Sequence, residues 1–258
     1  MSRSLFLSAL AVATVALSAT SAFAGPVTVY QGTDLSVAFG SPIPNSDAAA
    51  AAFNAALAGM AQPVTKIDFE STPPGAIGAP TAIGAGVTLG VTNTPNSSIT
   101  NTQNVFGMFN TTPGGSNYFG FVTQFVAQGA TTTATATFAF ASPIDAFGAT
   151  FTGLGTDTIF TIDFFDGSSQ TISGLGSALG SDAAFYGFID PGSAIASVTL
   201  TDTWTSPFPN FAYFVGVDDV QFATPTPEPA SMLLLGSGLM TLAVRRRRSK
   251  GSPARSER

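Results

Sequence analysis

The stretch Phe160-Thr161-Ile162-Asp163-Phe164-Phe165-Asp166-Gly167 decides the fold class of this chain. Its apolar residues Phe160, Ile162 and Phe164 alternate with polar ones, which is the period of a strand with one buried face. Asp166-Gly167 follows directly, and an Asp-Gly pair is typical of a tight hairpin turn. The stretch therefore predicts an antiparallel hairpin.

The same strand pattern recurs in both directions along the chain. The segment from Ala196 to Thr201 alternates in the same way. Further strands are expected at Ile67 to Glu70, Gly86 to Thr92, Tyr118 to Val126, Ala134 to Phe140, Ala146 to Thr152, Ala183 to Ile189 and Tyr213 to Phe222. Roughly nine to eleven short strands, separated by Gly, Pro, Asn or Asp, predict an all-β fold, an antiparallel β-sandwich of jelly-roll type.

One short helix is expected before these strands. Asn45-Ser46-Asp47 has the composition of a helix N-cap, and the alanine-rich run from Ala48 to Ala58 follows it. The helix should end at Gly59 and present one apolar face, made of Phe53, Leu57 and Met60.

The composition excludes several classes of function. The 258 residues include 23 Phe but neither Cys nor His, which excludes disulfides, the usual zinc and copper sites and every Ser-His-Asp or Cys-His nucleophile. Between Gly25 and Thr224, thirteen carboxylates and one basic residue, Lys66, give a net charge of −12. Nucleic acid is therefore not expected as a partner, and divalent cations are the more natural counter-ions.

The N-terminus has the three parts of a secretory signal peptide, in order. Arg3 supplies the positive charge, Leu5 to Leu17 the apolar run, and Ala22-Phe23-Ala24 the small-residue cleavage site. Residues 1–24 are therefore predicted to be removed by signal peptidase, which leaves Gly25 as the first residue of the mature protein.

The C-terminus has the pattern of a marginal membrane anchor. A proline-rich linker, residues 225–229, precedes an apolar segment, residues 230–244, and a basic tail, residues 245–258. Fifteen helical residues rise about 22 Å, less than the ~30 Å apolar slab, so the span is short. Arg245, Arg246, Arg247 and Arg248 form the stop-transfer block and place the tail in the cytoplasm.

This tail resembles the PEP-CTERM sorting signal. The resemblance rests on Pro227-Glu228-Pro229, on the Leu/Gly segment Leu233 to Leu239 and on the arginine block. It implies that Pro227, Glu228 and Pro229 are recognised by exosortase, a membrane protease, and that the helix is then removed. It further implies an exported protein that is anchored in the inner membrane before processing and reaches the cell surface or the extracellular space afterwards.

The segment from Phe138 to Phe222 resembles the outer domain often found upstream of this sorting signal. The matching pieces are Phe140 to Gly148, Phe165 to Gly167, Phe185 to Asp190 and Gly216 to Val220, with Lys66 to Glu70 as the opening strand. The resemblance implies a jelly-roll fold and no particular activity. The expected organisation is thus an N-terminal segment with a helix, residues 25–63, and a sandwich domain, residues 64–224.

Two adjacent carboxylates, Asp218 and Asp219, are the first candidate site. Neighbouring strand residues face opposite ways, so one of the two should lie against the interior unless the strand bulges or ends there. A Ca²⁺ ion could hold it there with oxygens from Asp68, Glu70 and turn carbonyls. The alternative, which we favour, is an edge-strand aspartate held by backbone N–H groups. No metal ligands are therefore assigned, and no cofactor is expected beyond a possible Ca²⁺.

Two further features have both an ordinary and a functional interpretation. Trp204, expected on a loop, is either a stacking platform for a sugar ring or a plug at the end of the core. Thr131, Thr133, Thr135 and Thr137 should form a row on one strand face, which is either an ordinary solvent face or an ice-binding surface. Asn96-Ser97-Ser98 and Asn110-Thr111-Thr112 match the glycosylation triplet but are expected to be polar turns.

The sequence thus predicts a non-enzymatic surface or extracellular-matrix protein, structural or adhesive in association with exopolysaccharide. The alternative is a calcium-dependent carbohydrate-binding module. A glycoside hydrolase that uses two carboxylates is a further alternative, but the sequence singles out no carboxylate pair.

Overall fold

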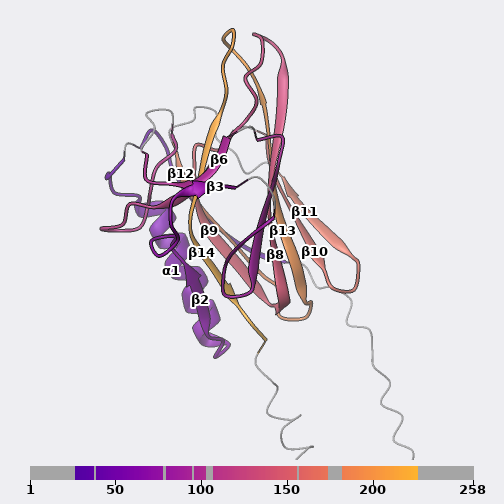
Figure 1. Cartoon of the computed structure of the whole chain (residues 1–258). Coiled ribbons are helices and arrows are strands. Elements are labelled where there is room, and N and C mark those ends of the chain that lie inside the picture. The colour runs from indigo at the N-terminus through magenta and orange to yellow at the C-terminus, as the bar shows by residue number, and fades with distance from the viewer. Residues whose placement is uncertain are drawn as a thin grey trace, which may run out of the picture.

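Two antiparallel sheets pack face to face in this computed structural model (Figure 1), which describes residues 27–225 except 38, 78–79, 95, 103–106, 156 and 174–181. The predicted all-β sandwich with one short helix is confirmed. The predicted signal peptide and C-terminal helix lie outside the described residues. No helix among the described residues has the length and apolar character needed to cross a membrane.

The larger sheet has eight strands, seven of them in one continuous order. The order is β1 (Thr28–Asp34), β12 (Ala183–Ile189), β9 (Ala146–Thr152), β14 (Phe214–Ala223), β7 (Tyr118–Val122), β6 (Asn96–Thr100) and β3 (Gly75–Ala76). The eighth strand, β2 (Val64–Ile67), pairs with the second half of β14, while β7 pairs with the first half. On one side, the neighbour of β14 therefore changes from β7 to β2 half-way along the strand. The candidate site lies at this change.

The smaller sheet has six strands. The order is β11 (Ser169–Ser173), β10 (Asp157–Phe164), β13 (Ile195–Thr205), β8 (Thr131–Ile144), β5 (Val87–Thr92) and β4 (Thr81–Gly84). The predicted hairpin is confirmed, because β10 and β11 pair on either side of Asp166-Gly167. Gly167 has φ 86° there, a conformation that glycine adopts at little cost.

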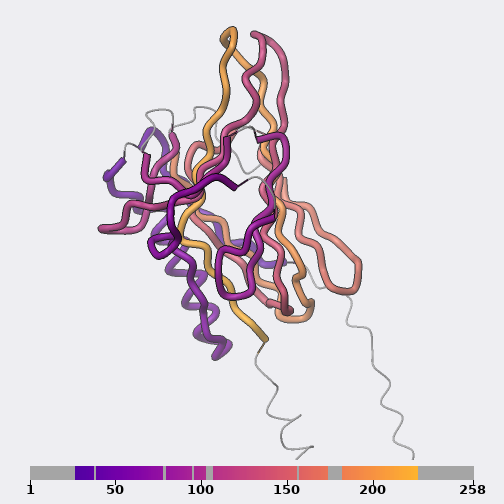
Figure 2. Tube along the Cα trace, viewed as in Figure 1, coloured from indigo at the N-terminus to yellow at the C-terminus, as the bar shows by residue number. Residues whose placement is uncertain are grey.

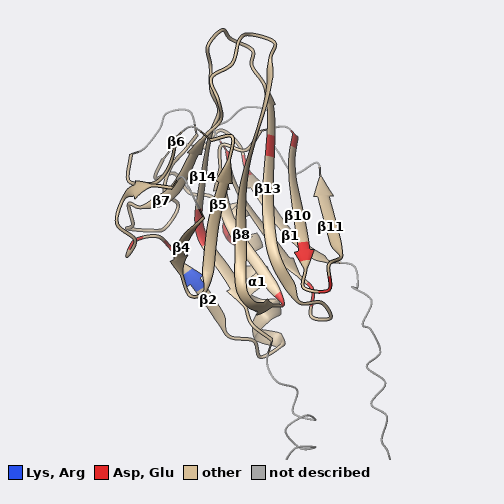
Figure 3. Cartoon of the chain, turned by 45° about the vertical axis from the view of Figure 1, so that its right-hand side comes forward, with Lys and Arg blue, Asp and Glu red and all other residues tan. Residues whose placement is uncertain are grey.

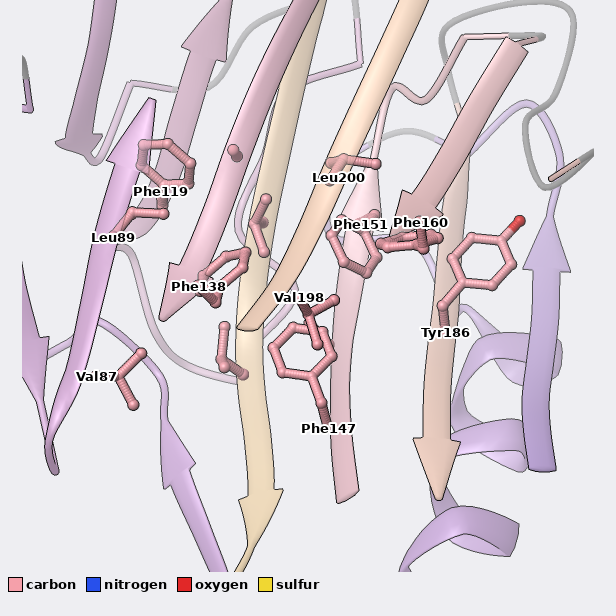
Figure 4. Close-up of a cluster of buried hydrophobic side chains, with 14 of the residues drawn as sticks. Val87, Leu89, Phe119, Phe138, Phe147, Phe151, Phe160, Tyr186, Val198 and Leu200 are labelled. Atoms are coloured by element: carbon pink, nitrogen blue, oxygen red, sulfur yellow. The ribbon is translucent and has the colours of Figure 1, made fainter. Parts of the chain in front are cut away.

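The core lies between the two sheets and consists mainly of phenylalanine. Figure 4 shows side chains of both sheets directed toward one another. Phe160 of the smaller sheet packs against Phe151 and Phe188 of the larger, with 5.1 Å between ring centroids in each pair. The alternating apolar residues of β10 thus bury one face and leave the other toward solvent.

The helix α1 (Pro44–Gly59) covers the outer face of the larger sheet. Phe53 and Leu57 are fully buried against β9 and β12, whose residues are buried on both faces for this reason. The prediction of Asn45-Ser46-Asp47 as the cap is wrong: the N-cap position is Ile43, which makes no side-chain capping bond. Asp34 at the end of β1 accepts the N–H groups of Asn45 (3.0 Å) and Ser46 (2.8 Å) instead.

Three local predictions are corrected by the structure. The opening strand ends at Ile67 and does not reach Glu70, because Phe69 has φ 60° and leaves the ladder. Trp204 lies in β13 and pairs with Thr132, so it is not on a loop. Asn96-Ser97-Ser98 begins β6 and is not a turn.

The segments that precede β8 and follow β13 rise together as a narrow projection (Figure 2). An isolated bridge joins Val126 to Phe211, and Ser206 donates its backbone N–H to Ala130 O at 3.0 Å. The projection therefore continues the pairing of β8 with β13 beyond the sandwich.

Candidate functional site

The adjacent carboxylates Asp218 and Asp219 lie at a bulge in β14. The register with β9 shifts between Asp218 and Gln221, and Asp219 has φ 51°. The Thr112 hydroxyl contacts both carboxylates, Asp219 Oδ1 at 2.5 Å and Asp218 Oδ2 at 3.3 Å. A bulge interrupts the alternation of side chains along a strand. It brings two adjacent carboxylates to the same side here, which a regular strand would not do.

Backbone N–H groups hold the buried member of the pair. Asp218 is 1% exposed, and its Oδ2 accepts the N–H groups of Thr111 at 2.8 Å and Thr112 at 3.0 Å. Burial, together with the nearby Asp219 carboxylate, raises the pKa of Asp218 to about 6, although the N–H groups act to lower it. These contacts agree with the N–H donors that we favoured from the sequence. The expectation of an edge strand is wrong, because β14 has neighbours on both sides in the larger sheet.

Glu70 holds the other end of the same loop. Its Oε1 accepts the N–H groups of Ser116 (2.8 Å) and Asn117 (3.0 Å) and the side-chain amide of Asn110 (2.9 Å). Asp218 and Glu70 therefore hold the two ends of the loop 110–117 by hydrogen bonds. The Asn110-Thr111-Thr112 triplet is part of this loop.

The remaining acidic groups of the cluster have partners of their own. Lys66, in β2 (Figure 3), forms an ion pair of 2.9 Å with Asp219 Oδ1. Asp68 Oδ1 accepts the backbone N–H of Glu70 at 3.1 Å. Within the described part of the chain, no group of three or more acidic side chains is arranged to hold a metal ion.

A pocket of about 470 Å³ opens beside this loop. Its lining residues are Phe39, Gly40, Ser41, Pro42, Ile43, Asp47, Phe109, Asn110, Thr111, Thr112, Pro113, Gly114 and Gly115. Phe39 is 55% exposed, whereas Phe109 is buried. The pocket thus combines an accessible aromatic ring with hydroxyl and backbone polar groups, which is the usual make-up of a small-molecule site.

Asp47 is the only carboxylate among the described lining residues. Burial, and the charges of Asp34 and Asp219, raise its pKa. A glycosidase needs two carboxyl groups across the bond it cleaves. The described lining residues supply one such carboxyl group.

Sequence reasoning missed this pocket. It assigned Asp47 to a helix cap and gave no role to Phe39 or Phe109. Only the fold places the 39–47 and 109–115 segments next to each other, so no local pattern could have identified the site.

The row of threonines on β8 is confirmed and is wider than expected. Thr131, Thr133, Thr135 and Thr137 pair with Thr205, Thr203, Thr201 and Thr199 of β13. Hydroxyl contacts join three of these pairs at 2.9 to 3.0 Å. Thr92 of β5 and Thr161 of β10 extend the array on either side. Part of the outer face of the smaller sheet is therefore a lattice of threonines.

Trp204 packs at the end of the core. Its ring lies 5.1 Å from that of Tyr213 and 5.3 Å from that of Phe211, and the side chain is partly buried against the core. These contacts favour the interpretation that Trp204 closes the end of the core over the interpretation that it is an exposed stacking platform for a sugar ring.

Comparison with known proteins identifies the tail. Residues 225–248 match the family model of the PEP-CTERM protein-sorting motif. The chain carries a PEP-CTERM sorting motif. The motif indicates an exported protein that is sorted by exosortase. Pro227, Glu228, Pro229 and Arg245 to Arg248 fall within the matched range but outside the described residues, so their predicted roles in recognition and stop-transfer stay predictions.

The PEP-CTERM chain has no match among curated proteins but has distant similarity to solved structures. An exo-beta-agarase is 12% identical with a TM-score of 0.37; the similarity covers 62% of this chain and 25% of that one. The enzymatically active domain of tailspike protein 4 of Bacteriophage CBA120 is 18% identical with a TM-score of 0.33, over 54% and 19% of the two chains. TmCBM61, solved in complex with beta-1,4-galactotriose, is 10% identical with a TM-score of 0.31, over 61% and 94%. The chain thus spans about a quarter or less of the first two.

Proposed function

We propose that this protein is a non-enzymatic, exported surface protein that adheres to neutral extracellular polysaccharide through the pocket beside the loop 110–117. The observation that carries the proposal is the lining: an accessible phenylalanine ring lines the same pocket as hydroxyl and backbone polar groups and, among the described residues, a single carboxylate. A sugar ring offers an apolar face to an aromatic ring and hydroxyl groups to polar partners.

The way the loop is held supports binding over catalysis. Asp218 and Glu70 each accept two backbone N–H groups and so fix the pocket wall in place. A wall fixed before binding loses little conformational entropy when a ligand binds. In this interpretation the carboxylates position the pocket, and neither takes part in a reaction.

The test is a glycan array with the full-length chain, followed by titration of the glycans that bind. Phe39→Ala should weaken binding at least about fivefold, as for an aromatic contact worth more than about 1 kcal/mol. Phe165→Ala is the matched control, because Phe165 is 51% exposed but lies on the β10–β11 hairpin, away from the pocket.

Two outcomes would count against the proposal. Equal glycan affinities for the parent and Phe39→Ala would mean that the glycan does not bind in this pocket. Release of reducing ends from a bound glycan, lost in Asp47→Asn, would mean that the pocket is catalytic.

A second candidate function, binding to ice, is favoured by the threonine lattice. Strands are spaced about 4.8 Å apart and alternate residues of a strand about 6.7 Å apart, so the hydroxyl and methyl groups form a regular array. An array of this kind can order water at its surface. The test is inhibition of ice recrystallisation: Thr201→Lys in the centre of the lattice should abolish it, and Thr28→Lys, at an exposed position of β1 in the larger sheet, should retain it.

A further inference from the structure

A group of four buried polar side chains lies at the end of the sandwich away from the projection, where three connections meet. Gln62 follows α1, Asp145 separates β8 from β9, and Asp190 and Ser193 belong to the turn between β12 and β13. All four are at most 9% exposed. One backbone bond joins two of these connections, because Asp190 N donates to Asp145 O at 2.8 Å. Within the β12–β13 turn, Ser193 N donates to Asp190 O at 3.4 Å.

The side chains of this group leave oxygen atoms without partners. The described part of the chain has five buried side-chain oxygens that lack a hydrogen bond, and three of them are here: Gln62 Oε1, Asp190 Oδ2 and Ser193 Oγ. Gln62 donates its amide Nε2 to Asp145 Oδ2 at 2.5 Å, and the carbonyl oxygen of the same amide is the atom left without a partner. A buried polar atom without a partner costs free energy and calls for an explanation.

The group also carries negative charge that no side chain in the described part of the chain balances. Asp145 and Asp190 are close enough for the charge of Asp190 to act on Asp145. Burial, and then this charge, raise the pKa of Asp145, against the hydrogen bond from Gln62. Lys66, the sole basic residue between Gly25 and Thr224, is bound to Asp219. Two carboxylates buried without a cation are unfavourable.

We propose that Gln62, Asp145, Asp190 and Ser193 form a calcium site that joins the α1–β2, β8–β9 and β12–β13 connections. All the unpartnered atoms are oxygens, and carboxylate, amide and hydroxyl oxygens are the ligands of hard cations. A divalent ion would offset the two negative charges and occupy the unpartnered oxygens at once. This site is distinct from the cluster of Asp68, Glu70, Asp218 and Asp219, where N–H donors and Lys66 already fill that role.

The test is the thermal unfolding of the full-length chain at pH 7, after treatment with chelator and again with Ca²⁺. At about a hundred times Kd, a bound ion should raise Tm by roughly 5 to 10 °C for a protein of this size. Isothermal titration should give one ion per chain.

Three variants locate the ion. Asp190→Asn keeps the shape of the side chain but removes one charged ligand, and it should lose the Ca²⁺-dependent rise in Tm. Asp163→Asn is the matched control, because Asp163 lies on β10 with Ser197 as its partner, and it should keep the rise. Asp218→Asn should also keep it.

Two outcomes would overturn the proposal, and a third case calls for another variant. If neither Tm nor the titration responds to Ca²⁺, the group holds water or a shared proton instead. If Asp218→Asn loses the rise and Asp190→Asn keeps it, the ion belongs to the other cluster. If Asp190→Asn fails to fold, the stoichiometry of Asp145→Asn decides, since loss of the single bound ion is expected there and its retention contradicts the site.

Discussion

The carboxylate of Asp34, the last residue of β1, accepts the backbone N–H of Ser46 in the first turn of α1 at 2.8 Å. The helix therefore takes its N-terminal cap from a strand twelve residues earlier. Ser46 in turn donates its hydroxyl to Ala183 O of β12 at 3.0 Å, so the helix start is fastened to two strands.

Asp34→Ala should destabilise the protein by about 1 to 2 kcal/mol, since the first-turn N–H groups lose their acceptor. Burial acts to raise the pKa of Asp34, but the hydrogen bonds from Ser46 and Asn45 together lower it below 3.8. The ionised Asp34 carboxylate thus contributes its full stabilisation well above pH 3.8, and this contribution is lost as the pH falls through the lowered pKa of the folded state. Urea unfolding of parent and variant at pH 7 and at pH 3 should show a smaller difference at pH 3.

Asp202 should make the stability fall as the pH rises from about 4 to about 6. The residue is fully buried, its Oδ2 lacks a partner among the described residues, and burial raises its pKa to about 6. The folded protein therefore holds a proton that the unfolded chain has released, which favours folding at the acidic end of this range. Asp202→Asn should flatten the curve of unfolding free energy against pH. An unchanged slope would contradict this role.

Phe160→Ala should cost about 3 to 5 kcal/mol, because it removes the ring that contacts Phe151 and Phe188 across the two sheets. Phe165→Ala, at the exposed neighbour on the same hairpin, should change the unfolding free energy by less than about 0.5 kcal/mol. Chemical denaturation of both variants checks the prediction, and similar losses would mean that the β10 register is wrong.

Glu228→Ala should leave export intact and prevent removal of the tail. The motif Pro227-Glu228-Pro229 follows the last strand of the sandwich in the sequence, and we expect the outer domain to fold as in the parent. In a host with exosortase, immunoblots of membrane and medium fractions should show a longer, membrane-bound form of the variant. Replacing Arg245 to Arg248 by neutral residues should impair membrane orientation instead. If the parent and Glu228→Ala have equal sizes and partition equally between the fractions, the tail is an ordinary membrane anchor that is not processed.

Most interior strands were predictable from sequence, whereas most edge strands were not. β9 and β12 have the predicted bounds because their apolar runs are buried on both faces. β1, β3 and β4 occupy three of the four sheet edges and were not predicted, and β11, at the fourth, was expected only as the partner strand of the hairpin. The interior strand β6 was missed as well, because its polar start was expected to be a turn. Edge strands form through backbone bonds to one neighbour, so their side chains need no apolar pattern. Ser169 to Ser173 of β11, for example, is polar except for Ile172.

The candidate site was predictable only in part. Asp218 and Asp219 stand out because two adjacent carboxylates do not suit a regular strand, and the bulge accounts for both. Their partners, Thr111 and Thr112, lie more than a hundred residues earlier in the chain, and no spacing points to them.

The sequence by itself determined the sorting motif, the all-β class and the inward rows of phenylalanine, because each depends on the order of neighbouring residues. Tertiary structure alone decided the pocket between residues 39–47 and 109–115, the cap from Asp34 and the meeting of Gln62, Asp145, Asp190 and Ser193. The physical reason is that strand periodicity fixes which face a side chain takes, while the pairing order of the strands fixes which distant segment it meets.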